Sequence, residues 1–299
     1  MKIENSIKRN IAYLFNCFKW SKQYKAIVSG PRKTNFVQNN EWENKSRILM
    51  MVPHADDELI SSYSVLCNAE DVTVYYCGFT GSNNKEENRT TRRKEILALC
   101  SELNVQIIEG DANCMNLREV ISQGKFDTIL IPSIVDWHAE HRRISYLINN
   151  VCASLHLRPR IYTYSVTVPN ESHKEVICIP LSADQLQKKY NLFKRIYLSQ
   201  KVMPIVRLKL NEKINGYHAG CYAAEVFSKY EFDKWTVNIT RVELFERKDN
   251  TQQKELIDYL RRNLNNLVLV RQSSKAFYNC IENEDKEYGN INCFNSMCV

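Results

Sequence analysis

The segment Met50–Glu58 reads M-M-V-P-H-A-D-D-E and places one imidazole, that of His54, almost beside three carboxylates, those of Asp56, Asp57 and Glu58. Adjacent carboxylates repel one another, and this repulsion costs stability unless a cation offsets the charge. A structural loop has no need of that arrangement. The residue types therefore favour a cation-binding loop over the alternative, an acidic cluster that complements the dipole at the start of a helix.

A second segment with the same kind of chemistry is Asp136–Arg142, which reads D-W-H-A-E-H-R. His138 and His141 are three positions apart, so a helix would present both on one side. This spacing is weak evidence when taken alone, because His138 could simply begin a helix. Combined with the first segment, two histidines and an aspartate give a facial N,N,O ligand set that suits zinc and leaves a position open for water. A third imidazole and a second carboxylate would remain beside the metal as catalytic groups.

Both segments directly follow predicted strands. Strand-like apolar runs cover residues 47–52, 72–79, 105–109, 128–131, 160–168 and 175–181. Helical patterns cover residues 57–67, 86–103, 115–122, 138–155, 182–199 and 219–228. This alternation predicts an α/β fold with a Rossmann-like, mostly parallel sheet and helices on both faces, in a single main domain. Active sites of such sheets lie beyond the carboxyl ends of the strands, so the two segments should meet at one edge.

The predicted catalytic domain covers residues 46–248 and lies between a basic arm, residues 1–45, and a C-terminal segment, residues 249–299. Residues 1–33 hold eight basic side chains and one acidic one, so they account for the formal net charge of +7. Apolar residues of the arm recur at helical spacing: Ile7, Ile11, Leu14, Phe15 and Phe18. The arm is expected to be a helix packed on the domain. The alternative is a basic amphipathic helix that contacts an anionic membrane through residues 1–33. In the C-terminal segment we expect a polar helix over residues 251–267 and then a tail.

The composition excludes several classes of protein. A chain of 299 residues with 44% hydrophobic and 25% charged residues is ordinary for a soluble globular protein. Its 11 cysteines include no C-x-x-C pair, which indicates reduced thiols and a cytoplasmic location. The apolar stretch 11–18 is too short to span a membrane, and no cleavage site for a secretory signal follows it. Residues 34–299 are formally neutral, so no nucleic-acid partner is expected.

P-H-A-D-D-E followed by H-A-E-H-R resembles the PIG-L / LmbE-like superfamily of N-acetylglucosaminyl deacetylases, whose usual motifs are P-H-P-D-D-E and H-x-D-H. Weaker similarities follow in the family order, namely G-F-T-G-S-N-N with an R-R-K-E helix, the S-Q of Leu198–Gln200, and A-A-E-V-F within Gly216–Phe227. The resemblance covers about residues 46–230. Two positions depart from the family pattern, because Ala55 replaces a proline and Glu140 replaces an aspartate. Neither change removes a catalytic group.

The resemblance implies roles for five residues. His54, Asp57 and His141 would hold the metal, which we expect to be Zn²⁺ or another divalent transition metal. Asp56 would be the general base. His138 would polarise the oxyanion, in its protonated form, or protonate the leaving amine.

Other residues are expected around this centre. The resemblance implies that Arg92 helps to hold the substrate, and Thr80 and His218 are further candidates for substrate contacts. Glu58, which begins the predicted helix, is expected to support the metal ligands from outside the coordination sphere. Asp136 is expected to do the same.

The predicted function is therefore zinc-dependent removal of the acetyl group from an N-acetylglucosamine-type sugar or glycoconjugate. Amide hydrolysis needs an activated water, an oxyanion stabiliser and a proton for the leaving nitrogen, and these residue types can supply all three. The alternatives are an amidase for a non-sugar conjugate and a catalytically silent sugar-binding module. A zinc base deaminase would need a P-C-x-x-C pair, which the chain lacks. A dinucleotide or P-loop nucleotide site is also unsupported, because neither glycine-rich motif occurs.

Overall fold

The apolar run Arg47–Val52 forms strand β2, the strand from which the site is built. Its neighbours in the sheet are β5 (Thr128–Pro132) and β3 (Asp71–Tyr76), and both pairs are parallel. Alternate side chains enter two different hydrophobic cores: Leu49 and Met51 face one core, and Ile48, Met50 and Val52 face the other. Burial on both sides is typical of a parallel strand that helices cover on both faces.

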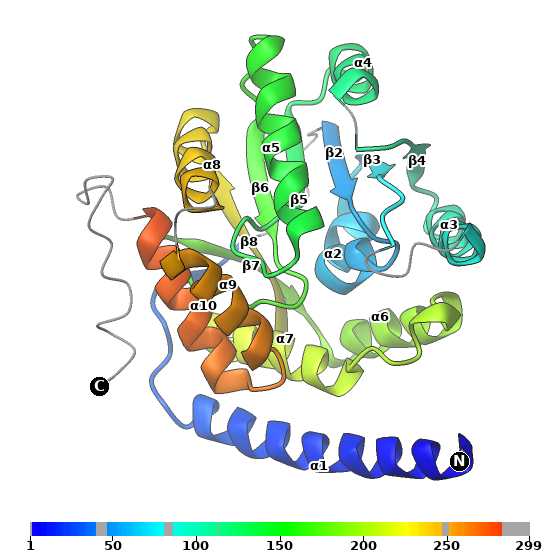
Figure 1. The fold of residues 1–299 in the computed structure, drawn as a ribbon, viewed down its shortest axis with the longest axis vertical. Helices are drawn as coiled ribbons and strands as arrows, with labels where there is room; N and C mark the ends of the chain where they lie inside the picture. The colour runs from blue at the N-terminus through cyan, green and yellow to red at the C-terminus, as the bar shows by residue number, and fades with distance from the viewer. Residues whose placement is uncertain (1, 40–46, 81–85, 113, 247–250, 283–299) are drawn as a thin grey trace.

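The computed structural model of the chain describes residues 2–39, 47–80, 86–112, 114–246 and 251–282. Within these residues an eight-stranded sheet runs in the order β1-β7-β8-β6-β5-β2-β3-β4 (Figure 1). The remaining strands are β1 (Phe36–Gln38), β4 (Gln106–Glu109), β6 (Arg160–Tyr164), β7 (Val176–Leu181) and β8 (Ala223–Tyr230). Strand β8 pairs antiparallel with β6 and β7, and all other pairs are parallel. The predicted mostly parallel α/β fold is confirmed.

Helices cover both faces of the sheet, as predicted (Figure 1). One core is formed with α2 (Asp57–Asn68), α3 (Glu86–Glu102), α6 (Ala183–Ile196) and α7 (Ile205–Ala219). The other core is formed with α4 (Cys114–Gly124), α5 (Ala139–Ser154), α8 (Phe232–Glu246), α9 (Thr251–Asn263) and α10 (Leu267–Glu282). A 3₁₀ turn, Leu198–Gln200, follows α6. Within the described residues, every helix is too short or too polar to span a bilayer.

The order of the strands creates a crevice between β2 and β5. The chain runs from β2 to β3 and β4 on one side, and it then returns to β5 on the other side of β2. Loops that leave the carboxyl ends of two such strands diverge in opposite directions, and ligands of open α/β sheets bind in the gap between them. The histidine-containing segments follow these two strands.

The predicted helix over residues 219–228 was wrong. Helix α7 ends at Ala219, because Gly220 adopts a left-handed conformation with φ of 82° and terminates it. The A-A-E-V-F run that follows lies in strand β8, whose residues are nearly all buried. A strand buried on both faces lacks the alternating pattern that distinguishes a strand from a helix, and Ala and Glu favour a helix locally. Pairing with β6 and β7 overrides that local preference.

The chain after residue 267 is also more ordered than the predicted tail. Residues 267–282 form α10, which packs Phe277, Tyr278 and Ile281 into the core. The prediction of a tail was therefore wrong for this stretch, and residues 283–299 lie outside the described residues. Eight cysteines of the described part are free thiols. Cys280 is disulfide-bonded, so the expectation of reduced thiols is wrong at this position.

The basic arm contributes to the fold in two places. Helix α1 (Lys2–Val28) lies on the outside of the molecule against α7 and α10 (Figure 1). Further along, Phe36–Gln38 forms β1, which pairs in parallel with β7 at the edge of the sheet. Residues expected to belong only to an arm are therefore part of the main sheet.

Candidate metal centre

The loop after β2 presents His54, Asp56 and Asp57 at the carboxyl edge of the sheet. Asp57 begins helix α2, and its Oδ2 accepts a hydrogen bond of 2.9 Å from the backbone N–H of His54. Asp56 precedes the helix with a φ of 136°, which is unusual for a residue other than glycine. Such a conformation costs about 1–3 kcal/mol and is concentrated at functional sites. The backbone conformation of Asp56 therefore lowers the stability of the fold by an amount of this order.

The loop after β5 supplies the other two imidazoles. His138 is the N-cap of α5, and its backbone N–H donates to Asp136 Oδ1 at 2.8 Å. Arg142 donates to the backbone oxygen of Asp136 at 2.6 Å, which fastens the loop to the first turn of the helix. His141 lies one turn into α5 and is buried. Its ring and that of His138 stack with centroids 5.1 Å apart.

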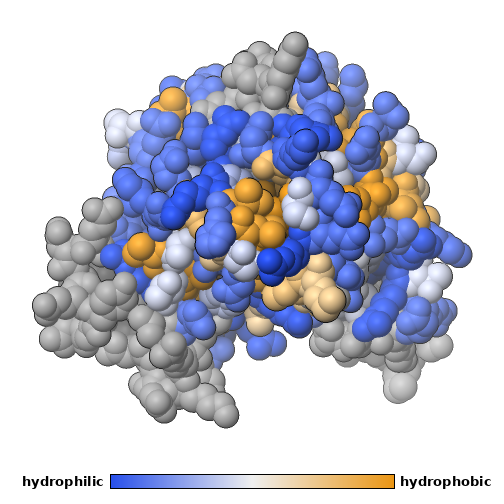
Figure 2. Space-filling model, turned by 90° about the horizontal axis from the view of Figure 1, so that it is seen from above, coloured by the Kyte–Doolittle hydropathy of each residue, from blue (hydrophilic) through white to orange (hydrophobic). Residues whose placement is uncertain are grey.

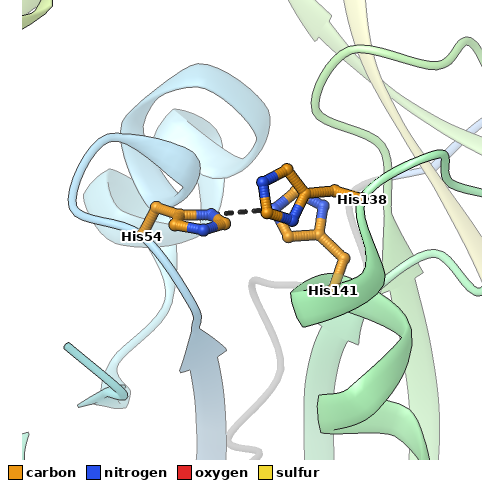
Figure 3. A group of neighbouring side chains, drawn as sticks. All are labelled: His54, His138 and His141. Atoms are coloured by element: carbon orange, nitrogen blue, oxygen red, sulfur yellow. Dashed lines mark hydrogen bonds between the residues drawn. The ribbon is translucent and has the colours of Figure 1, made fainter. Parts of the chain in front are cut away.

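The two loops meet. Ring nitrogens of His54, His138 and His141 lie within 4.8 Å of one another, a grouping that could hold a metal ion, and Figure 3 shows the three side chains pointing toward each other. His54 Nδ1 and His141 Nε2 are 3.0 Å apart. Asp57 Oδ2 lies 3.2 Å from His54 Nδ1 and 3.3 Å from His141 Nε2. We call these three atoms, Asp57 Oδ2, His54 Nδ1 and His141 Nε2, the donor triangle.

The donor triangle has the dimensions of one face of a tetrahedral zinc site. Ligand atoms that each lie about 2.0–2.1 Å from zinc are separated from one another by about 3.3 Å. The observed separations of 3.0, 3.2 and 3.3 Å agree with that spacing. Two imidazole nitrogens and one carboxylate oxygen are also a donor set that zinc accepts. The residues present therefore fit the metal that the sequence predicts.

Each histidine of the donor triangle has a carboxylate on its second ring nitrogen. His141 Nδ1 lies 3.0 Å from Asp136 Oδ2, and His54 Nε2 lies 2.6 Å from Glu140 Oε2. Carboxylates in this position orient a metal-binding imidazole and fix which nitrogen faces the metal. Asp136 was expected in such a supporting place, and Glu140 joins it.

No family model matches the sequence, and no curated protein matches it. Solved structures do match. N,N'-diacetylchitobiose deacetylase from Pyrococcus horikoshii aligns with a TM-score of 0.50 and 18% identity over 72% of this chain and 92% of its own. The conserved protein TT1542 from Thermus thermophilus aligns with a TM-score of 0.50 and 20% identity over 61% of this chain and 93% of its own. The zinc-inhibited form of teicoplanin deacetylase aligns with a TM-score of 0.49 and 16% identity over 62% of this chain and 97% of its own. The chain has the fold of the LmbE-like deacetylases. Sequence identities of 16–20% show that these proteins share a fold with this chain, and they show nothing further.

Charges within the candidate site compensate one another. Burial alone would raise the pKa of Asp57, but His141 and His54 hold it well below its usual range. Burial likewise opposes protonation of His141, yet Asp57 and Asp136 raise its pKa well above the usual value. A buried carboxylate of this kind requires positive charge beside it. A divalent cation within the donor triangle would supply that charge.

Asp56 and Glu58 lie outside the donor triangle, and burial raises the pKa of both carboxyl groups. Burial, followed by the charges of Asp57 and Glu58, raises the pKa of Asp56 well above its usual value. Burial also raises the pKa of Glu58, to about 7. Glu58 accepts hydrogen bonds from the Tyr197 hydroxyl and, at 3.2 Å, from the backbone N–H of Asp56. Glu58 therefore fixes the position of the Asp56 backbone.

His138 differs from the other two histidines. Burial, together with the neighbouring His54 and His141, lowers its pKa to about 4. Its Nδ1 accepts a hydrogen bond of 3.4 Å from the backbone N–H of Glu140. In the neutral ring the proton is therefore on Nε2. The lowered pKa favours the neutral ring, and the role of His138 toward the oxyanion or the leaving amine stays a prediction.

The donor triangle opens into a cavity of about 210 Å³. Of the predicted substrate residues, Thr80 and Arg92 line this cavity. His218 does not, because it packs against Phe36 and accepts a hydrogen bond from the backbone of Lys33. Residues 81–85, which follow Thr80, lie outside the described residues.

Further cavity residues were not predicted as site residues: Trp137, Val166, Thr167, Gln200 and Met203. Trp137 stands within the second motif, and Thr167 follows the end of β6, so the strand-end rule could have found both. Trp137 Nε1 donates to Thr167 Oγ1 at 3.0 Å. With the Gln200 amide turned so that both partners are satisfied, Arg92 donates to its oxygen at 2.6 and 3.0 Å. These bonds hold an aromatic ring and a guanidinium at the rim of the cavity.

Proposed function

We propose that the chain is a zinc-dependent N-deacetylase that hydrolyses the acetamido group of an N-acetylglucosamine-type sugar or glycoconjugate and releases acetate. The observation that carries this proposal is the donor triangle of His54, Asp57 and His141, with Asp56 and His138 beside it. A fold shared with a diacetylchitobiose deacetylase supports the substrate class. The aromatic and polar lining of the cavity, with Trp137 and Thr167, suits a sugar ring.

His54, Asp57 and His141 would hold the ion. A bound zinc ion supplies Lewis acidity, which lowers the pKa of a coordinated water to about 7 and polarises a carbonyl oxygen. Asp136 and Glu140 keep the two imidazoles oriented for this purpose. The residues that remain must then move protons and bind the substrate.

Asp56 acts as the general base. Its raised pKa makes it a stronger proton acceptor than an ordinary aspartate, and general bases work best when their pKa lies near the operating pH. The water adds its oxygen to the carbonyl carbon while its proton passes to Asp56. When the C–N bond breaks, Asp56 returns that proton to the departing amine. The products are acetate and the free amino sugar.

His138 stabilises the carbonyl oxygen as negative charge develops on it. A neutral imidazole that donates from Nε2 provides this hydrogen bond without carrying a charge in the resting site. The loss of one such donor typically costs about 10²–10³ in kcat. Arg92, held by Gln200, would contact the sugar.

Acetate release from N-acetylglucosamine, N,N'-diacetylchitobiose and non-sugar acetamides, measured together with metal content, tests the proposal. The purified protein should deacetylate one of the sugars, lose activity on chelation, and regain it with Zn²⁺. Asp56→Asn should lower kcat by about 10²–10⁴ and retain the metal, because Asp56 is not part of the donor triangle. Asp57→Asn, the matched change one residue away, should lose the metal.

Three outcomes would contradict the proposal. Full activity in metal-free protein would exclude the mechanism. Loss of metal from the Asp56 variant would assign the two carboxylates the other way round. Activity toward the non-sugar acetamides alone would identify an amidase of a different substrate class.

A further inference from the structure

Helix α1 has two different faces, and one of them attaches it to the molecule. Trp20 is 1% exposed, packs against Ile214 and Leu267, and donates from Nε1 to the backbone oxygen of Asn265 at 2.9 Å. Cys17, Tyr24, Ile27 and Val28 pack around the same cluster. These residues recur at helical spacing on one side of α1, so that side is fully used in holding the helix to α7 and α10.

The opposite side of α1 is apolar and exposed. Ile11, Leu14, Phe15 and Phe18 are 49%, 68%, 71% and 75% exposed. They are spaced i, i+3, i+4 and i+7, which places them on one stripe. At 100° per residue, that stripe lies about 180° from Trp20 on the helix. We call these four residues the outer stripe, and none of them belongs to the cluster that attaches the helix.

Positive charge accompanies the outer stripe. Lys22 and Lys25 continue it by one to two turns at the same helical spacing, and both are exposed, as is Lys19. No acidic side chain occurs between residues 5 and 33, and residues 1–33 hold the whole formal net charge of the chain. A helix with exposed aromatic and aliphatic side chains and flanking lysines has the composition of one that lies in a membrane interface.

We propose that the outer stripe of α1 docks on the surface of an anionic lipid bilayer. The apolar side chains would enter the boundary between headgroups and acyl chains, and the lysines would contact anionic headgroups. A second copy of the chain is a poorer occupant, because a symmetric contact would bring the lysines of two helices together. The helix lies on the bilayer and does not cross it, since it is too polar to span one. The proposal is independent of the deacetylase activity.

Flotation of the full-length protein with vesicles tests this proposal. Wild type should float with vesicles of phosphatidylcholine and phosphatidylserine at low salt and should bind vesicles of phosphatidylcholine alone much more weakly. Phe15→Ser/Phe18→Ser should lower binding to the anionic vesicles by at least about tenfold. Lys22→Glu/Lys25→Glu should do the same, because it reverses the attraction to the anionic lipid.

Matched controls come from exposed residues far from α1. Helices α4 and α8 lie at the opposite end of the molecule from α1, an end that Figure 2 shows as largely hydrophilic around a smaller hydrophobic area. Met115→Ser/Val237→Ser removes exposed apolar side chains from these helices, and Lys125→Glu/Lys234→Glu repeats the charge reversal there. Both controls should bind anionic vesicles as wild type does. Circular dichroism and thermal melting of every variant establish that it is folded.

Three results would overturn the proposal. The first is undiminished binding of the folded Phe15→Ser/Phe18→Ser variant, and the second is equal binding of wild type to neutral and anionic vesicles. The third is failure of wild type to bind vesicles while sedimentation equilibrium shows a dimer that Phe15→Ser/Phe18→Ser dissociates. That last outcome would identify a second copy of the chain as the partner.

Discussion

At the scale of single residues, each histidine of the donor triangle has one ring nitrogen in the triangle and the other beside a carboxylate. His141 is paired with Asp136, which is buried, and His54 is paired with Glu140, whose side chain is 27% exposed. His54 Nε2 lies 2.6 Å from Glu140 Oε2, so the glutamate that stands in place of the aspartate of the resembled motif contacts an imidazole of the donor triangle.

Glu140→Gln is therefore expected to weaken zinc binding by about 10–100-fold, as is typical when the hydrogen-bond partner of a metal-binding histidine is changed. Asp136→Asn, which affects the other histidine, should have an effect of the same order. Competition with a zinc-chelating dye measures both dissociation constants. Glu243→Gln, an exposed carboxylate on α8, is the control. If Glu140→Gln binds zinc as tightly as the control does, Glu140 has no part in orienting His54.

At the scale of secondary-structure elements, α7 was not predicted and β8 was predicted as part of a helix, and the two elements touch at a glycine. A Cβ built on Gly216 would lie 2.5 Å from the Cα of Ala223. Backbone atoms at that distance cannot move aside as a flexible side chain can. The helix and the strand therefore pack with their backbones closer than any other residue at this position would allow.

Gly216→Ala should destabilise the protein by about 1–3 kcal/mol, the usual cost of overpacking. The sign is informative, because replacing a glycine inside a helix by alanine ordinarily stabilises it by about 1 kcal/mol. Urea unfolding measures the change in free energy. Gly30→Ala is the matched control, since its added Cβ would approach nothing closer than 3.4 Å, and it should shift stability by no more than about 1 kcal/mol. An unchanged midpoint for Gly216→Ala would mean that α7 and β8 lie further apart.

At the scale of the whole molecule, a polar cluster joins the segment between α1 and β1 to the rest of the chain. The backbone N–H of Lys33 donates to His218 Nδ1 on α7 at 3.3 Å. The Lys33 ammonium pairs with Glu171, which also binds Arg271 of α10 at 2.5 Å. The cluster thus links the N-terminal segment to elements near the end of the described chain, and His218 has a structural place in it.

Stability should depend on pH through His218. Burial, followed by the charges of Lys33 and Arg271, lowers its pKa from 6.5 to about 4. The unfolded chain therefore binds a proton at His218 below about pH 6.5, whereas the folded chain does so only near pH 4. The free energy of unfolding should fall as the pH is lowered through this window. His218→Gln should show a shallower decline in urea unfolding between pH 7 and 4 than wild type, and parallel curves would contradict the assignment.

Part of the candidate site could be predicted from the sequence alone. His54, Asp57, His138 and His141 each stand within a few residues of a buried apolar run, so strand-end reasoning could bring them to one edge of the sheet. Strands with simple apolar runs, such as β2 and β5, were likewise predicted almost to the residue. The local sequence sufficed because a strand that is buried on both faces of the sheet is a continuous apolar run of neighbouring residues.

Other features were decided only by tertiary structure. Glu140 reaches His54 across 86 positions of the chain, and Thr167 and Gln200 come to the cavity from later elements. The strand β8 contradicts its local pattern because pairing with distant strands outweighs local propensity. The sequence by itself determined which groups could do the chemistry and at which edge of the sheet they would meet. The packing of distant segments decided what orients those groups and what lines the cavity, because such contacts leave no repeat in neighbouring residues.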